Sequence, residues 1–364
     1  MSLLEIFQSK RKKYEKDEKS DGSDVEETDS DSHLEDSEDE TRKYRPGGYF
    51  NPEGKNILKD SRGKKWTLGE KIGRGHFSTV YSCADADSVQ YAMKIQKSAK
   101  SYRVAAREEI LIHEFLSKSN KEGKTHVCIM NFNFSYNHNT SGKHFCMVFP
   151  KMRYDLDKYA QKFEENKIDL EKTSKIAFQV LSGLNFLHKT GFLHADLKPE
   201  NILVSEEDIF SISDLGTAAV IGDRDYSYIQ TSHYRSPEII MGHRQWDEKI
   251  DIWSMGCIVY ECITGSYLFK GECEEDYITA FIETIGIPNY SFIEECKNRR
   301  DFFNRDNRFR NACDLEPLSI DRILQEKYDF NRDTANAIFA LIQPMLIWDL
   351  ERRWSAESLL QLYK

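Results

Sequence analysis

Four polar residues that lie close together between positions 194 and 201 are suited to phosphoryl transfer. In the stretch GFLHADLKPENIL they are His194, Asp196, Lys198 and Asn201. Asp196 can accept the proton of a substrate hydroxyl, Lys198 can neutralise a transferred phosphoryl group, and Asn201 can bind a metal ion. An ordinary turn between a helix and a strand does not need so many polar groups, so the spacing predicts a catalytic loop.

A second metal-binding group follows thirteen residues after Asn201, where Asp214 begins the sequence Asp-Leu-Gly. Phosphoryl transfer needs a cation that offsets the charge of the phosphates, and carboxylate and amide oxygens are suitable hard ligands. We therefore predict that Asn201 and Asp214 hold Mg²⁺.

A glycine-rich turn and a lysine earlier in the chain are suited to binding nucleotide phosphates. Gly73 and Gly75 lie between two predicted strands, and Lys94 follows Val80 by fourteen residues. Glycines let backbone N–H groups approach phosphate oxygens, and the lysine adds positive charge. Glu109 lies on the next predicted helix, where its carboxylate can hold the ammonium group of Lys94.

Two periodicities describe the elements that must position these residues. Residues 66–96 consist of short β-rich runs separated by turns, which predicts an antiparallel sheet. Apolar residues recur at helical spacing in residues 103–118 and 174–191, and Gly191 ends the second helix before the catalytic loop. Residues 249–265 are apolar on almost every side, which predicts a buried helix. The sequence therefore predicts an α+β protein with two lobes.

The composition limits the class of protein and its partners. The chain has 364 residues, of which 39% are hydrophobic, so it is long enough for one large domain or for two lobes with sizeable cores. It contains no run of 18 apolar residues, so we expect no membrane span and an intracellular protein. Its net charge of −10 argues against direct nucleic-acid binding and suits a basic partner. The eight cysteines form no CxxC pair, so we expect mostly buried thiols.

The N-terminal region differs from the rest of the chain in composition. Residues 20–40 are nearly all Ser, Asp and Glu, so we expect residues 1–45 to form a disordered acidic tail. A lead-in segment, 46–65, would precede a first lobe with a hinge, 66–152, and a second lobe, 153–364. The basic cluster KRKKYEK before the acidic run is either a nuclear import signal or a solvated tail, and we expect the protein in cytoplasm and nucleus.

Taken in order and spacing, these segments resemble the eukaryotic protein kinases. The matching segments run from Gly73 to Ala356 and are GRGHFSTV, YAMK, AAREEI, HADLKPEN, DLG, SPE, DIWSMGC and DLERRWSA. The resemblance implies a two-lobed kinase fold with a β-rich first lobe and a mainly helical second lobe. It also implies a serine/threonine kinase that uses ATP and Mg²⁺, with Lys94, Asp196 and Lys198 as catalytic residues.

The same resemblance assigns further residues by position. Phe149 takes the gatekeeper position, and residues 150–152 form a hinge in which the Pro150 carbonyl and the Met152 N–H face adenine. Glu238 and Arg353 are expected to form an ion pair beneath the activation segment. The nucleotide site implied in this way consists of Ile72, Gly73, Gly75, Val80, Ala92, Lys94, Glu109, Pro150, Met152 and Leu203.

Within the kinases, the sequence is most similar to the SR-protein kinases of the CMGC group, which phosphorylate serines in Arg-Ser repeats of splicing factors. The shared particulars are the GGYF lead-in after an acidic run, GHFSTV, SAKSYRVAA, DLG in place of DFG, and IQTSHYRSPE before TGSYLF. The resemblance implies a monomer with basic, Arg/Ser-rich protein substrates and a role in mRNA processing. The Ser236-Pro237 pair and the missing long insert between the lobes depart from that family.

Three alternatives stay open at this point. Tyr226 and Tyr228 form a Tyr-x-Tyr pair that resembles the dual-specificity tyrosine-regulated kinases, and the LAMMER kinases are a second alternative. A pseudokinase that only binds partners is the alternative without catalysis. Lys94, Asp196, Asn201 and Asp214 are all present, which argues against it.

Ala195 stands where most kinases carry an arginine. That arginine is a buried cation that needs a phosphate on the activation loop, and alanine removes the need. We therefore predict activity without phosphorylation of the activation loop.

A further helix is predicted within residues 271–288, and it places two carboxylates on one face. Asp276 and Glu283 are seven residues, or two turns, apart, which is about 10 Å. SR-protein kinases resemble this arrangement in their substrate-docking groove, although the further Asp expected there is Ser266. We predict that Asp276 and Glu283 dock basic substrates, and the alternative is a solvated helix face.

Overall fold

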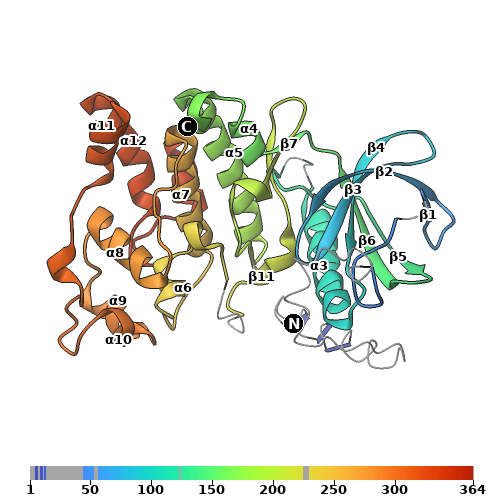
Figure 1. Cartoon of the computed structure of the whole chain (residues 1–364), viewed down its shortest axis with the longest axis horizontal. Coiled ribbons are helices and arrows are strands. Elements are labelled where there is room, and N and C mark those ends of the chain that lie inside the picture. Colours follow the sequence, from blue (N-terminus) through green and yellow to red (C-terminus); the bar gives the residue numbers. More distant parts are fainter. Residues whose placement is uncertain are drawn as a thin grey trace. The chain divides into compact units, whose positions relative to one another are not determined.

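Short strands with alternating burial form a six-stranded antiparallel sheet in the first part of the chain (Figure 1). The structure is a computed structural model that describes residues 5–6, 9–10, 12–13, 44–52, 56–121, 123, 125–223 and 229–363. Of the predicted acidic tail, 1–45, the structure describes only residues 5–6, 9–10, 12–13 and 44–45. The acidic run 20–40 and the pair Tyr226 and Tyr228 lie outside the described residues. The chain divides into two units, of which the first holds residues 1–124 and 128–153 and the second holds 125–127 and 154–364.

The sheet of the first unit has the strand order β1-β2-β3-β4-β6-β5, and each pair of neighbours is antiparallel. Successive side chains along a strand point to opposite faces, so Met93 and Ile95 are fully buried on one face while Lys94 lies on the other. The strands are β1 (Ile57–Lys59), β2 (Lys65–Arg74), β3 (Ser78–Ala84), β4 (Gln90–Gln96), β5 (Phe132–His138) and β6 (Gly142–Pro150).

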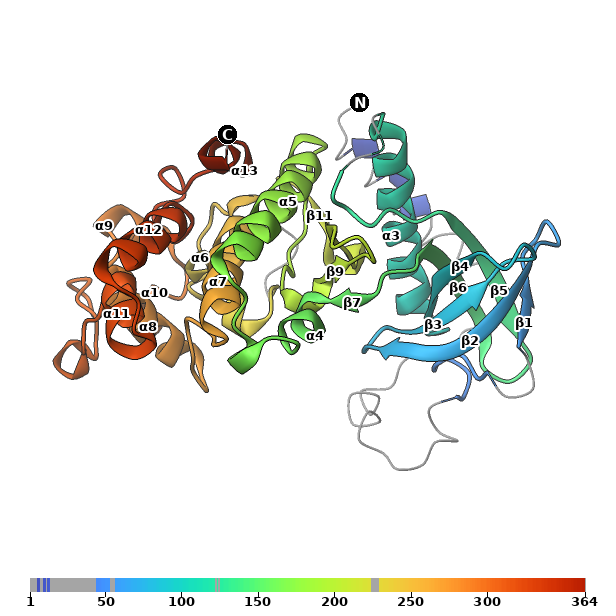
Figure 2. The same ribbon diagram turned by 90° about the horizontal axis from the view of Figure 1, so that it is seen from above.

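The two faces of this sheet are covered differently. Helix α3 (Lys100–Ser119) packs against β4 and β6, where Ile110 and Met147 share a small core (Figure 2). The opposite face carries the larger core, built around Trp66, Met93 and Val148. Phe50 belongs to that core and is only 1% exposed. The lead-in segment is therefore an integral part of the first unit.

The second unit is mainly helical and is built around α7 (Lys249–Thr264), whose residues are nearly all buried. Two small sheets, β10-β9-β7 and β11-β8, lie beside the helices. The remaining elements are β7 (Tyr154–Asp155), α4 (Leu156–Ala160), α5 (Leu170–Lys189), β8 (Phe192–Leu193), β9 (Ile202–Val204), β10 (Phe210–Ile212), β11 (Ala219–Val220), α6 (Pro237–Ile240), α8 (Glu274–Ile285), α9 (Tyr290–Glu295), α10 (Arg299–Phe302), α11 (Ile320–Tyr328), α12 (Arg332–Ile342) and α13 (Ala356–Leu359).

Local sequence explains where the two long helices of this unit begin and end. The side chain of Asp169 accepts the Lys172 N–H and caps the start of α5, and Gly191 follows its end with φ at +89°. Helix α7 ends at Gly265, where φ is +68° and an added Cβ would lie 2.0 Å from the Glu165 carbonyl oxygen. Only glycine fits at that position.

The predicted α+β organisation, with a β-rich first lobe and a helical second lobe, is confirmed. All four helices predicted from residues 103–118, 174–191, 249–265 and 271–288 are present as α3, α5, α7 and α8. Six of the eight cysteines are buried, and Cys273 and Cys313 are exposed. In the part of the chain that the structure describes, no helix is both long enough and apolar enough to cross a membrane.

Candidate active site

Three neighbouring strands of the first unit place the predicted nucleotide-binding side chains on one face of the sheet. Val80 of β3 pairs with Lys94 of β4, and Ala92 of β4 pairs with Phe149 of β6. Side chains alternate along a strand, so Ala92 and Lys94, two residues apart, point to the same side of the sheet. Val80 and Phe149, which lie directly opposite them, point to that side as well. That side is the face against which α3 packs. The structure therefore brings Val80, Ala92 and Lys94 together.

Lys94 and Glu109 form the predicted ion pair. Lys94 Nζ lies 2.7 Å from Glu109 Oε1 and 2.9 Å from Oε2, and Lys94 is only 9% exposed and Glu109 1%. The Gln96 amide also donates to Glu109 Oε2, at 3.3 Å. A buried ammonium group held by a carboxylate in this way has a defined position and can meet the charge of a phosphate.

The glycine-rich turn connects β2 and β3. Gly73 pairs with Val80, and Gly75 N–H donates to the Ser78 carbonyl at 2.9 Å, which closes the hairpin. Nothing lies within 4 Å of the point where a Cβ of Gly75 would be, so the turn presents bare backbone. Ile72 precedes it and is 46% exposed. The turn has the open backbone that phosphate binding requires.

The predicted hinge follows β6. Phe149 is half-buried and its ring lies edge-on to His113 of α3, with ring centres 5.1 Å apart. Pro150 ends β6 and is exposed, and Met152 beyond it is half-buried. Residues 150–152 therefore lie at the end of the first unit.

The catalytic loop of the second unit lies between β8 and β9, and its backbone is held by buried groups. The Asp196 N–H donates to His194 Nδ1 at 3.2 Å, which leaves the ring proton on Nε2 for the Ser213 carbonyl at 2.8 Å. His194 is fully buried. Lys198 precedes the 3₁₀ turn Pro199–Asn201, and Leu203 lies in β9. The predicted cluster is thus a loop fixed at both ends by strands.

Both oxygens of Asp196 have defined neighbours. Oδ1 accepts the Thr231 hydroxyl at 2.7 Å and the Thr231 N–H at 3.0 Å, and Oδ2 lies 3.1 Å from Lys198 Nζ. Lys198 Nζ also donates to Thr231 Oγ1 at 3.1 Å. Asp196 and Lys198 are thereby brought together, as predicted, and Thr231 orients both. The role of Thr231 was not predicted from the sequence.

Ser213 connects Asn201 to Asp214. The Asn201 carbonyl accepts both the N–H and the hydroxyl of Ser213, at 2.8 Å and 3.1 Å, and Asp214 follows directly. Asn201 Nδ2 donates to the Asp196 carbonyl at 2.8 Å, so its Oδ1 is left to bind a cation. Asp214 is exposed and has φ at +58°. An amide oxygen and a carboxylate fit Mg²⁺, which usually binds one or two protein ligands and substrate phosphates.

Asp251, inside the apolar helix α7, is a buried carboxylate that the sequence did not reveal. Its Oδ2 accepts the His194 N–H at 2.8 Å and its Oδ1 accepts the Ala195 N–H at 2.9 Å. Burial alone would raise the pKa of Asp251, but the hydrogen bond from His188 at 3.0 Å and the neighbouring imidazoles bring this pKa below its ordinary value. A buried ionised Asp251 therefore holds the start of the catalytic loop.

Gln230 is a second anchor that sequence reasoning missed. It is 6% exposed, and its amide bonds Ser236 N–H and Oγ, the Ile250 carbonyl and Ser254 Oγ, all at 2.9 to 3.0 Å. Its N–H donates to the Ala195 carbonyl at 2.9 Å, and its own carbonyl accepts Arg235 Nη2 at 2.8 Å. The side chain of Ala195 is buried in an apolar core. Gln230 thus joins the activation segment to the catalytic loop.

The predicted pair of Glu238 and Arg353 is confirmed as a bidentate ion pair. The two N···O distances are 2.6 Å and 2.9 Å, and both side chains are fully buried. Arg353 also donates to the Ile347 and Lys249 carbonyls, which accounts for further N–H groups of the guanidinium.

Asp276 and Glu283 lie on the same helix, α8, but each also has a structural task. Asp276 Oδ2 accepts the N–H groups of Glu272 and Cys273, and these bonds hold the pKa of Asp276 below its ordinary value. Glu283 Oε1 accepts the Glu316 N–H at 2.9 Å. Each carboxylate is thus held in place by at least one backbone N–H group.

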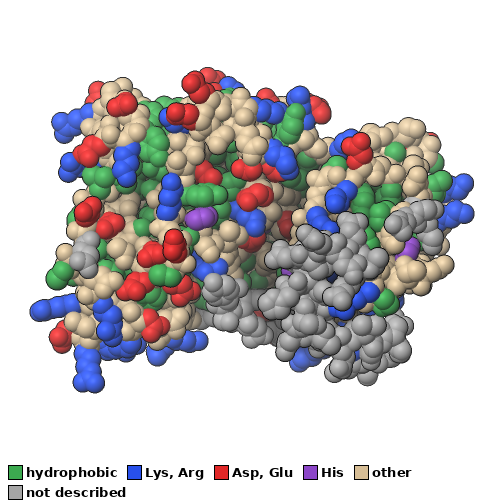
Figure 3. All heavy atoms as spheres, in the orientation of Figure 1, with side chains coloured by type: hydrophobic (Ala, Val, Ile, Leu, Met, Phe, Trp, Pro, Cys, Tyr) green, Lys and Arg blue, Asp and Glu red, His purple; other side chains and the backbone are tan. Residues whose placement is uncertain are grey.

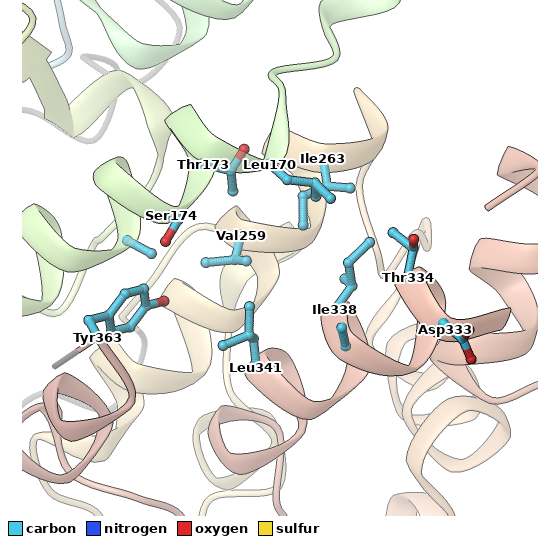
Figure 4. A pocket seen from close by; sticks show the side chains of 12 residues that line it. Leu170, Thr173, Ser174, Val259, Ile263, Asp333, Thr334, Ile338, Leu341 and Tyr363 are labelled. Atoms are coloured by element: carbon cyan, nitrogen blue, oxygen red, sulfur yellow. The ribbon is translucent and has the colours of Figure 1, made fainter. Parts of the chain in front are cut away.

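A cavity of about 350 Å³ lies elsewhere in the second unit, between α5, α7, α12 and the C-terminal turn (Figure 4). Its lining is mainly apolar and includes Val259, Ile338 and Leu341, with Tyr363 at one end. None of the predicted site residues lines it.

Comparisons with known proteins agree with this geometry. A family model described as "Protein kinase domain" matches residues 66–363. The chain is 30% identical to "Serine/threonine-protein kinase SRPK" of Physarum polycephalum, over 90% of this chain and 91% of that protein. It is 35% identical to "Dual specificity tyrosine-phosphorylation-regulated kinase 3" of Mus musculus and of Homo sapiens, over 71% of this chain and 44% of each of those proteins. The match thus spans less than half the length of these two relatives.

Proposed function

We propose, since the chain belongs to the protein kinase family and is a serine/threonine kinase of the CMGC type, that its substrates are basic proteins with Arg/Ser-rich segments. The observation that carries this proposal is the pair of oriented carboxylates on α8. Asp276 and Glu283 lie two turns apart on one face of α8, and backbone N–H groups hold each carboxylate in place. Carboxylates oriented in this way suit charge-assisted bonds from guanidinium groups. Acidic side chains gather over α8 in Figure 3.

A second group of carboxylates, close to the catalytic loop, supports a basic substrate. Glu261 accepts the Tyr234 hydroxyl at 2.7 Å, and burial, together with the charges of Glu200 and Asp157, raises the pKa of Glu261 to about 7. Glu200 lies four residues after Asp196 in the same loop. A cationic side chain placed here would relieve the repulsion among the three carboxylates, so an arginine near the modified serine would be favoured.

The reaction that we propose is transfer of the ATP γ-phosphoryl group to a serine hydroxyl. The serine oxygen bonds the γ-phosphorus, and the bond from that phosphorus to the bridging oxygen breaks and releases ADP. Asp196 accepts the hydroxyl proton, and its bonds to Thr231 fix which oxygen faces the substrate. Lys198 offsets negative charge on the transferred group, and Lys94, held by Glu109, offsets charge on the nucleotide. Mg²⁺, held by Asn201 and Asp214 when bound, would supply the remaining neutralisation of the phosphates.

The test compares phosphorylation rates of three peptides with ATP: an Arg-Ser repeat, an Arg-x-x-Ser-Pro peptide and an acidic peptide. We expect the Arg-Ser repeat to be modified fastest, and Asp214→Ala to abolish transfer, which identifies the activity as that of this protein. Preference for the Arg-x-x-Ser-Pro peptide would instead favour the dual-specificity tyrosine-regulated kinases, to which the second relative belongs.

Docking on α8 is tested with isosteric changes, because alanine at Asp276 would also remove two backbone contacts. The double variant Asp276→Asn with Glu283→Gln should raise the KM for a long Arg-Ser repeat severalfold and leave a short peptide unchanged. Glu326→Gln on α11, which removes an exposed carboxylate paired with Arg322, is the matched control. Equal effects on the long and short peptides would remove the docking role.

A further inference from the structure

The lead-in segment reaches the glycine-rich turn through one tyrosine. Tyr49 Oη donates to the Gly75 carbonyl at 2.9 Å, and the His76 carbonyl lies 3.3 Å away. Tyr49 is only 6% exposed. No atom lies within 4 Å of a Cβ position at Gly75, so the hydrogen bond from Tyr49 to the Gly75 carbonyl restricts the backbone of the turn directly.

The ring of Tyr49 is fixed by two cations of the same unit. The Arg74 guanidinium carbon lies 4.0 Å from the ring centre, and Lys97 Nζ lies 4.6 Å from it. Arg74 is the last residue of β2, directly before Gly75. Contacts of this kind are favourable and directional, so the hydroxyl is held where the turn begins.

The backbone around Tyr49 is anchored to the body of the first unit. Gly47 N–H donates to Ser98 Oγ at 2.9 Å, and the N–H groups of Ser98 and Ala99 donate to the Gly48 and Gly47 carbonyls at 3.0 Å. Phe50, the next residue, lies edge-on to His138 and His144 in the core. The segment thus cannot shift without breaking contacts on both sides of Tyr49.

Helix α3 holds the same turn from another direction. Tyr102 Oη lies 3.2 Å from His76 Nε2, and the Tyr102 ring lies edge-on to Phe77. Tyr102 is seven residues before Glu109, so both lie on one side of α3. The helix that holds Lys94 through Glu109 therefore also contacts the tip of the glycine-rich turn.

We propose that Tyr49 is a positioning residue for ATP, acting through the Gly75 carbonyl. It lies outside residues 66–363, the span of the family model, so the nucleotide site extends into the lead-in segment. The inference rests on the proposed binding of ATP phosphates by the turn. Loss of the hydroxyl lets the turn sample conformations that do not bind phosphate, and the binding affinity falls with the fraction of competent molecules.

The test is Tyr49→Phe, which keeps the ring and its cation contacts and removes the hydroxyl alone. The KM for ATP should rise about fivefold, with kcat at saturating ATP changed less than about twofold and the Tm unchanged within about 2 °C. Tyr91→Phe is the matched control. Tyr91 lies in β4 of the first unit, and its ring packs on Trp66 and Phe132. Neither KM nor Tm should change in this control.

Hydrogen exchange of residues 73–78 without nucleotide separates this inference from the proposed function. Exchange should be faster in Tyr49→Phe than in the wild type and in Tyr91→Phe. Equal exchange in all three proteins, or a KM for ATP within twofold of the wild type, overturns the positioning role. A wild-type protein that neither binds nor uses ATP overturns the proposed function instead, whatever the exchange rates are.

Discussion

Replacing Gln230 by alanine should lower the free energy of unfolding by about 3 to 5 kcal/mol. The Gln230 amide makes four hydrogen bonds of 2.9 to 3.0 Å in a buried site. Each is worth about 0.5 to 1.5 kcal/mol net, and partners left without a bond add to the loss. Urea unfolding at pH 7 measures the difference, and the exposed Gln90→Ala, expected within about 0.5 kcal/mol of the wild type, is the control.

The backbone of Gln230 needs a separate control, because its φ is +67°. A left-handed conformation costs a residue with a side chain about 1 kcal/mol, which glycine would avoid. Gln230→Gly should nevertheless stay at least about 2 kcal/mol below the wild type, since it also loses the four amide bonds. If glycine restored wild-type stability, or alanine cost less than about 1 kcal/mol, the side-chain bonds would not be the anchor.

The same variant should lose activity by more than its stability explains. Thr231 follows Gln230 directly and bonds Asp196, so a displaced segment moves the groups that orient the catalytic carboxylate. We expect kcat of Gln230→Ala to fall at least about tenfold at a temperature where the protein is fully folded. A folded variant with wild-type kcat would show that the activation segment keeps its position without Gln230.

The second unit offers three more residues for testing, which are Ala195, Glu261 and Glu238. Phosphatase treatment should reduce activity less than about tenfold, or about 1.4 kcal/mol in the barrier, because Ala195 places no cation directly before Asp196 for a phosphate to neutralise. A larger loss in a peptide assay would contradict this. Burial raises the pKa of Glu261 to about 7. Its contribution to the free energy of unfolding is therefore fully present below its ordinary pKa of 4.5 and is lost as the pH rises through 7. Thermal melts should therefore show Glu261→Gln gaining about 3 kcal/mol on the wild type between pH 4.5 and pH 8, and parallel pH profiles would refute the assignment. Glu238→Gln should cost about 3 to 5 kcal/mol in urea unfolding, because it leaves the buried Arg353 uncompensated, and a loss below about 1 kcal/mol would contradict this.

The parts of the site that sequence could predict depend on side chains at short, regular spacing. Asp196 and Lys198 lie in one loop, and Lys94 and Glu109 are joined across a strand and the helix that follows it. Helical and strand periodicities place such residues, because burial of apolar side chains sets which face each element turns inward. Phosphoryl transfer also needs carboxylate, amide and ammonium groups, so the residue types alone narrow the choice.

The anchors escaped prediction because their partners are backbone groups far away in the sequence. Asp251 accepts N–H groups 56 and 57 residues before it, and Gln230 donates to a carbonyl 20 residues after it. A backbone N–H or carbonyl has the same chemistry at nearly every residue, so nothing in the partner's identity marks the contact. Asp251 even lies in an apolar helix, where the surrounding pattern indicates only burial.

The presence of Lys94, Asp196, Asn201 and Asp214 does not by itself establish how active the protein is. The proposed chemistry needs Lys94, Asp196, Asn201 and Asp214. Gln230 and Asp251 hold the backbone of the catalytic loop, and Tyr49 holds that of the glycine-rich turn. Preorganised groups accelerate transfer only if they are held near the productive geometry. A chain with all four catalytic residues and a defective anchor would therefore look like an active kinase in sequence and behave as a weak one. Measuring Gln230→Ala and Tyr49→Phe together distinguishes the two anchors, because the first should lower kcat and the second should raise the KM for ATP.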